Sequence, residues 1–184
     1  MKRMAATALA LACILATPIL ATPSWAALKP GDEAPAFTAQ AALGGQDFVF
    51  SLADALKKGP VVLYFFPKAF TTGCTAEAHE FAEAAGEFNA MGATLIGMSA
   101  DNIDTLHKFS LQACSGKFPV ASDPDLKVIK AYDSALVRVG SAGIADRISY
   151  VIAPDGKIVY AYSDRNPDKH VENTLAAVKA LQKK

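Results

Sequence analysis

The amino-acid sequence predicts a single α/β domain with a central mixed sheet flanked by helices. The unbroken apolar run at residues 61–66 and the largely apolar run at residues 93–100 are typical of strands that are buried on both faces. Each run is followed by a segment whose apolar residues have helical spacing. A hairpin signal and a last helix come next, and this alternation of strands and helices indicates a layered α/β domain.

The first half of the chain supplies a strand, a buried strand and a long helix. Residues 28–37 form a lead-in punctuated by prolines, and D-F-V-F at residues 47–50 predicts a short strand. The buried strand at residues 61–66 ends at Pro67. A helix is expected over residues 74–91, because apolar residues recur at i, i+3, i+4 and i+7. These residues are Phe81, Ala84, Ala85 and Phe88.

The middle of the chain repeats the strand–helix pattern. After the strand at residues 93–100, Asn102 is suited to cap the next helix, because its side chain can accept a bond from a free backbone N–H. The apolar face of that helix carries Ile103, Leu106 and Phe109. Residues 125–132 predict a further short helix.

The last third of the sequence predicts a hairpin and a final helix. Residues 148–153 and 157–162 flank a Pro-Asp-Gly turn, which is a hairpin signal. The stretch 166–168, Asn-Pro-Asp, begins a helix, because it offers a cap, a proline at the first helical position and an acid in the first turn. The apolar stripe of this helix comprises Val171, Leu175 and Val178. The sequence contains no internal repeat or linker.

The N-terminus has the features of a secretory signal peptide. M-K-R-M precedes an uncharged run at residues 5–20, and Ser24 and Ala26 occupy the small-residue positions of a cleavage site. Cleavage after Ala26 is expected, which leaves residues 27–184 as one domain, exported, with the periplasm as its compartment and no membrane attachment. A membrane anchor would need about 20 apolar residues. A lipoprotein would need Cys13 as the acceptor.

Composition excludes several classes of protein. Hydrophobic residues make up 52% of the chain and charged residues 20%, which is typical of a folded domain and not of a disordered one. The 18 basic residues balance 18 acidic ones, so no nucleic-acid partner is expected. Removal of the signal leaves Cys74 and Cys114. In an exported protein, two cysteines indicate either one structural bridge or a redox pair.

Cys74 is the strongest candidate for chemistry. It follows a buried strand and opens a helix, where backbone N–H groups and the helix dipole favour a thiolate. The alternative is a small buried residue that merely begins a helix. Pro67 and Thr71 precede the cysteine and complete the pattern P-x-x-x-T-x-x-C.

This pattern resembles the active-site signature of the peroxiredoxins, the alkyl hydroperoxide reductase and thiol-specific antioxidant family. The stretch P-K-A-F-T-T-G-C-T-A-E-A resembles the bacterioferritin-comigratory, or Q-type, branch in particular. Further similar segments occur in the expected order at residues 31–37, 122–125 and 147–158. The resemblance implies a thioredoxin-like fold and reduction of peroxides by a cysteine thiolate, with no cofactor: neither a metal nor haem is implied.

The resemblance also implies roles for four further residues. Arg147 is expected beside the thiolate, although an edge-strand arginine that pairs with Asp146 or solvent would explain it too. The Thr71 hydroxyl is expected to bond the peroxide or thiolate, or else to cap the helix. Pro67 is expected to shield the site, or else only to end the strand. Glu77 is expected to orient the arginine, unless it belongs to a solvated helix face.

The sequence departs from the branch at the second cysteine. Many members carry a resolving cysteine five residues after the first, where this chain has His79, which we expect on the surface. Cys114 is the remaining candidate to condense with a sulfenic acid at Cys74, which would require local unfolding. If Cys114 is an inert buried thiol, the enzyme is one-Cys. The histidines at 79, 107 and 170 lack metal-ligand spacing.

The expected function is thus an exported thiol peroxidase for hydrogen peroxide and small alkyl hydroperoxides. A thioredoxin-like protein or a small thiol would reset it, and the sequence leaves monomer or dimer open. Two alternatives remain. One is an envelope thiol–disulfide exchange protein, against which the missing C-x-x-C counts. The other is a non-catalytic redox-sensing domain, which would have no need of the complete signature.

Overall fold

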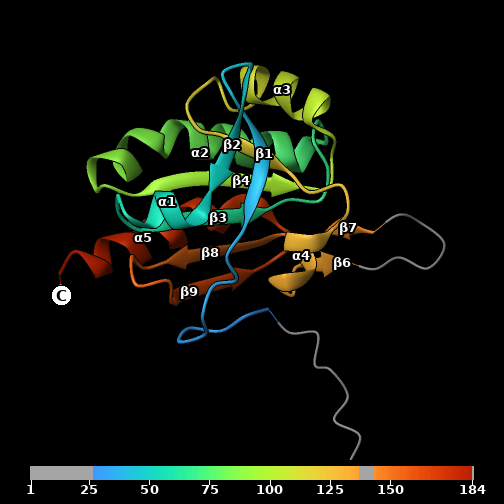
Figure 1. The fold of residues 1–184 in the computed structure, drawn as a ribbon. Coiled ribbons are helices and arrows are strands. Elements are labelled where there is room, and N and C mark those ends of the chain that lie inside the picture. Colours follow the sequence, from blue (N-terminus) through green and yellow to red (C-terminus); the bar gives the residue numbers. More distant parts are fainter. Residues whose placement is uncertain (1–26, 137–142, 184) are drawn as a thin grey trace, which may run out of the picture.

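A mixed seven-stranded sheet forms the centre of the molecule in the computed structural model, which describes residues 27–136 and 143–183 (Figure 1). The predicted signal peptide lies outside the described residues. In spatial order the strands are β2 (Gln46–Ser51), β1 (Thr38–Leu43), β5 (Val120–Ser122), β4 (Thr94–Ser99), β3 (Val61–Phe65), β8 (Ile148–Ile152) and β9 (Ile158–Ser163). The strands β3, β4 and β5 are parallel, and their other neighbours are antiparallel. A separate two-stranded ribbon comprises β6 (Ala135–Leu136) and β7 (Ile144–Ala145).

Helices cover both faces of the sheet. One face carries three helices: α2 (Thr72–Ala90), α3 (Ile103–Gln112) and α5 (His170–Leu181). The other carries two short ones, α1 (Leu52–Leu56) and α4 (Lys127–Ala131). Within the described part of the chain, no helix is long and apolar enough to cross a membrane. The predicted α/β layering is therefore confirmed.

The apolar run of β3 fills two cores at once. Successive side chains of a strand point to opposite faces, so Val62 and Tyr64 join the core under α2, while Leu63 and Phe65 join the core on the other face. Every residue of β3 is buried. Burial on both faces explains why the run shows no alternation of apolar and polar residues.

The two predicted central helices form as their sequences indicate. The four apolar residues expected on the inner face of α2 are all buried. The side chain of Asn102 caps α3 by accepting a bond from the Thr105 backbone N–H at 2.9 Å. The side chain of Asn166 likewise accepts from the Asp168 backbone N–H, and a 3₁₀ turn, η1 (Pro167–Lys169), leads into α5.

Five short elements were not predicted. They are β1, β5, β6, β7 and α1, and none carries a clear apolar period. In β1 only Ala41 and Ala42 are buried, and small residues give a weak signal. The β1 strand forms because β2 and β5 pair with it on either side, which is a tertiary condition. Ser51 caps the single turn of α1, which is too short for a helical period to show.

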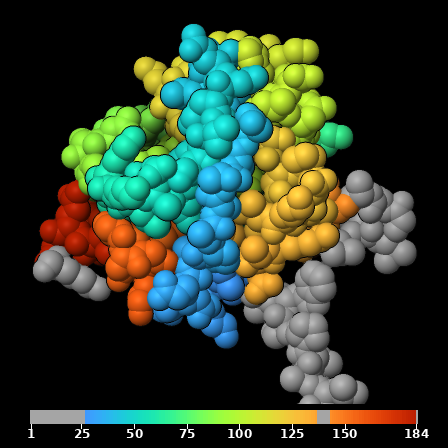
Figure 2. Space-filling view, in the orientation of Figure 1, coloured from blue at the N-terminus to red at the C-terminus, as the bar shows by residue number. Residues whose placement is uncertain are grey.

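The proline-punctuated lead-in is tied to the β8–β9 hairpin. The Gly31 N–H donates to the Ile158 carbonyl at 2.8 Å, and the Ala34 N–H donates to the Gly156 carbonyl at 2.9 Å. In Figure 2 the lead-in and β1 run as a blue band across the middle of the visible face. The lead-in therefore anchors the start of the domain to its C-terminal half.

Candidate active site

Cys74 lies in the first turn of α2, directly beyond the carboxyl end of β3. The helix begins at Thr72 with Thr71 as the capping residue, so Cys74 is its third residue. The cysteine side chain is 1% exposed. In open α/β sheets, ligand sites form beyond the carboxyl ends of the parallel strands, and free N–H groups there favour an anion. The predicted placement of Cys74 is confirmed.

The loop between β3 and α2 is pinned by the neighbouring strand. Pro67 follows the strand, and the Ala69 N–H donates to a carboxylate oxygen of Asp101 at 2.7 Å. The Ser99 hydroxyl donates to the same oxygen at 2.9 Å, which holds the carboxylate beyond the end of β4. Phe70 has a φ of 63°, a left-handed conformation that costs energy for a side chain of this size. Asp101 and this strained residue fix the path of the loop.

Thr71 does not cap the helix with its side chain. Its hydroxyl donates to the Lys68 carbonyl at 3.0 Å, inside the same loop. The hydroxyl oxygen therefore retains lone pairs that can accept a bond. Thr71 and Pro67 lie on the loop that leads to Cys74, but the structure gives neither side chain a bond to the sulfur.

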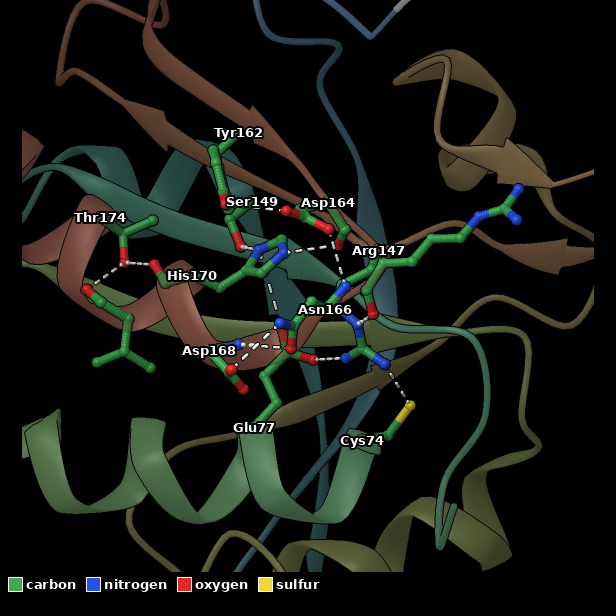
Figure 3. Close-up of polar contacts among 12 residues, drawn as sticks. Cys74, Glu77, Arg147, Ser149, Tyr162, Asp164, Asn166, Asp168, His170 and Thr174 are labelled. Carbon is green, nitrogen blue, oxygen red and sulfur yellow. Dashed lines mark hydrogen bonds and ion pairs between the residues drawn. The ribbon is translucent and has the colours of Figure 1, made fainter. Parts of the chain in front are cut away.

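Arg147 precedes β8 and reaches Cys74 with its guanidinium. One terminal nitrogen, Nη2, donates to the Cys74 Sγ at 3.5 Å. The other, Nη1, forms an ion pair with Glu77, and Nε donates to the Arg165 carbonyl at 2.9 Å (Figure 3). Only 5% of the residue is exposed. Three bonds from one planar group fix its orientation, so the positive charge is directed at the sulfur.

Gly73 provides the space for this approach. A Cβ at that position would lie 3.4 Å from Nη2 of Arg147, in direct contact with the guanidinium. The resemblance did not single out this glycine. The sequence signal available for it was its place directly before the cysteine.

Glu77 faces inward, one turn along α2 from Cys74. Its side chain is buried, which excludes the solvated helix face. Burial raises the pKa of Glu77 to about 8, and the charge of Arg147 opposes that rise. The ion pair with Arg147 favours the charged carboxylate, and a buried guanidinium requires such a partner.

His170, the first residue of α5, lies near Oε1 of Glu77, the carboxylate oxygen that Arg147 does not hold. Its Nδ1 is 3.8 Å from Glu77 Oε1 and 2.8 Å from the Ser149 hydroxyl oxygen. Sequence reasoning missed this residue. The available signal was its helical spacing with Thr174 and Val178, which places a histidine on the buried stripe of α5.

Cys114 follows α3 and is completely buried. Both cysteines are free thiols, and each belongs to the core between the sheet and α2. Burial in apolar surroundings raises the pKa of the Cys114 thiol. Cys114 is therefore held as a neutral thiol.

The remaining histidines lie away from this site. His79 is exposed on α2, as expected, and His107 pairs with Asp47 at 3.2 Å. Within residues 27–136 and 143–183, no three histidine, cysteine or acidic side chains are grouped so that they could hold a metal ion.

Comparison with known sequences gives a consistent result. A family model for the AhpC/TSA family matches residues 30–161. Peroxiredoxin Bcp of Xanthomonas campestris is 32% identical over 127 residues, covering 67% of this chain and 78% of that protein. The chloroplastic Peroxiredoxin Q of Oryza sativa subsp. japonica is 32% identical over 155 residues, covering 84% and 68%.

Solved structures with the same fold include two from this branch. Peroxidoxin BcpB of Mycobacterium tuberculosis has a TM-score of 0.76 at 30% identity, covering 84% of this chain and 98% of that one. A PrxQ mutant of Xylella fastidiosa has a TM-score of 0.75 at 26% identity, covering 85% and 99%. Fold and sequence together define a thiol-dependent peroxidase with a thioredoxin-like fold. The chain belongs to the AhpC/TSA family, the peroxiredoxins, and is similar to its Bcp and Q-type members.

The buried Cys114 thiol makes stability depend on pH. In the unfolded chain a cysteine loses its proton near pH 8.5, whereas the raised pKa keeps Cys114 protonated in the folded state. The contribution of Cys114 to the free energy of unfolding is therefore fully present below about pH 8.5. Above that pH it falls by roughly 1.4 kcal/mol per pH unit. Urea unfolding under reducing conditions between pH 7 and 10 should show a shallower decline for Cys114→Ala. Equal slopes for the two proteins would contradict the assignment.

Proposed function

We propose that Cys74 is the peroxidatic residue of an exported peroxiredoxin that reduces hydrogen peroxide and small alkyl hydroperoxides. The observation that carries the proposal is the 3.5 Å contact between Nη2 of Arg147 and the Cys74 sulfur, inside a buried site at a helix start. The thiolate attacks one peroxide oxygen as the O–O bond breaks. Cys74 becomes a sulfenic acid, and the other oxygen takes a proton and leaves as water or an alcohol.

Arg147 has the donors that this step requires. Negative charge moves from sulfur to the leaving oxygen, and a fixed cation beside both stabilises it without having to reorganise. Thr71 retains acceptor capacity toward a protonated peroxide oxygen, since its own hydrogen is used by the Lys68 carbonyl. Pro67 closes the strand end and shields the site from water. We assign both residues to peroxide positioning.

Cys114 is proposed as the resolving cysteine. Its thiol would condense with the Cys74 sulfenic acid to form a disulfide and release one water. Both side chains are buried in the folded state, so local unfolding must precede this step. The chain after Cys114 is suited to such opening, because Ser115 and Gly116 both have positive φ and are exposed. A thioredoxin-like protein or a small thiol would then reduce the disulfide.

Export rests on the N-terminal sequence. The positive start, the uncharged run and the small residues at 24 and 26 have the order of a cleaved signal. Fractionation of expressing cells should recover a protein that begins at Ala27 in the periplasm. A chain that retains residue 1 in the cytosol would contradict this proposal.

Arg147→Lys should slow the reaction of Cys74 with hydrogen peroxide by roughly 10²–10³-fold, because an ammonium group cannot hold Glu77, the Arg165 carbonyl and the sulfur together. Stopped-flow measurement of thiol consumption tests this. Arg165→Lys is the matched control, since the exposed Arg165 contributes only its backbone carbonyl to Arg147. Equal rates for wild type and Arg147→Lys would exclude the proposed role of the guanidinium.

One equivalent of hydrogen peroxide should remove two hydrogens from the reduced wild-type protein, as read by intact mass. Cys114→Ser should instead gain oxygen at Cys74, and Cys74→Ser should not change. If wild type and Cys114→Ser both gain oxygen, Cys114 does not resolve and the enzyme is one-Cys. An unchanged wild-type mass would favour a disulfide-exchange or sensing role.

A further inference from the structure

Glu77 has one carboxylate oxygen that is buried and unused. Its Oε2 is held by Arg147, but Oε1 has no hydrogen-bond partner among the residues that the structure describes. A buried carboxylate oxygen without a donor is costly, and native proteins seldom leave one in that state. His170 Nδ1 lies 3.8 Å from Oε1, and the His170 side chain is also fully buried.

The hydrogen bonds of His170 fix where its proton lies. Its Nε2 is 2.9 Å from the Asp164 carbonyl, which can only accept, so Nε2 carries the hydrogen. In the neutral ring, Nδ1 is then an acceptor and takes its bond from the Ser149 hydroxyl at 2.8 Å. Two acceptors, Nδ1 and Glu77 Oε1, therefore face each other with no hydrogen between them (Figure 3).

We propose that the gap between Glu77 Oε1 and His170 Nδ1 is a proton site, and that its occupancy controls how much of the Arg147 charge is available to Cys74. The inference rests on the proposed function of Cys74 and Arg147. One proton, held on either atom, gives Oε1 its missing hydrogen bond. Glu77 and His170 thereby become positioning residues that act through Arg147.

The surroundings of His170 contribute opposing charges. Arg147, next to β8, disfavours a positive charge on His170. Asp164, after β9, and Glu77, on α2, favour that charge. Tyr162 of β9 packs its ring against the imidazole, with centroids 4.8 Å apart. Burial lowers the pKa of His170 and raises that of Glu77 to about 8, so the carboxyl group binds the shared proton more tightly than the imidazole, and at 3.8 Å each group affects the protonation of the other. The pair thus titrates as a unit, not as two separate residues.

Occupancy changes the balance of charge at the sulfur. When the proton is present, Glu77 and His170 together carry no net charge, and more of the guanidinium charge is left for the Cys74 thiolate. When the proton leaves, the Glu77 carboxylate competes for the same guanidinium. Because the coupling is reciprocal, a thiolate at Cys74 must also favour retention of the proton.

The first test reads the proton site without turnover. NMR of the His170 ring nitrogens between pH 5 and 9 should show a titration in the reduced protein. Its midpoint should fall by roughly half a pH unit or more in Cys74→Ser, which has no thiolate, and further in Glu77→Gln. His79→Gln, an exposed change on the same helix, should leave the midpoint unchanged.

The second test reads the consequence for peroxide. Gln is nearly isosteric with Glu, and its amide can accept from Arg147 and donate to Nδ1, so Glu77→Gln imitates the occupied site at every pH. The ratio of the Glu77→Gln rate constant to the wild-type one should rise by roughly threefold from pH 5 to 9, as the wild-type site empties. The ratio for His79→Gln should stay at one.

A ratio that is constant across this pH range would overturn the proposal, since a purely structural effect of Glu77→Gln has no pH dependence. So would a His170 midpoint that is the same in wild type and in Glu77→Gln. If the wild type fails to react with peroxide at any pH, the proposed function is wrong. If the His170 midpoint still shifts in Glu77→Gln in that case, the proton site exists and only the proposed function has failed.

Discussion

The buried guanidinium of Arg147 is the group on which the site depends. It joins three parts of the chain that are remote in sequence: the first turns of α2, the start of β8 and the segment after β9. A buried cation is tolerated only when its donors are satisfied and a carboxylate compensates it, and Glu77 provides that carboxylate. The same bonds that make burial tolerable also direct the charge at Cys74. Stability and chemistry therefore rest on one side chain.

The fold explains why the thiol lies where it does. A buried parallel strand ends, a pinned loop turns, and a helix begins with free N–H groups, which is a general anion site in α/β sheets. Asp101, just beyond the end of β4, holds the loop through the Ala69 N–H. The site is thus built on a strand end, a pinned loop and a helix start, and the proposed proton site at Glu77 and His170 adjusts only how much of the guanidinium charge is available to Cys74.

The two cysteines have identical side chains but very different surroundings. Cys74 has a cationic donor on its sulfur, whereas Cys114 lies in apolar surroundings that keep its thiol neutral. Both are buried, so a disulfide between them requires the structure to open. Such an opening would bring water to the ion pair of Arg147 and Glu77. Resolution and loss of the reactive geometry are consequently expected to occur together.

The layered α/β architecture, the long elements and the place of Cys74 could be predicted from the sequence, because the spacing of apolar residues and the turn residues are local signals. The sequence also pointed to Arg147 and Glu77 through resemblance, but their ion pair required the fold. The strands β1 and β5 exist through their partners and left no clear period in the sequence. The contact of His170 with Glu77, and the space that Gly73 leaves for Arg147, were decided by tertiary structure alone. Each of these contacts joins residues far apart in the chain, and a local sequence pattern cannot predict such a contact.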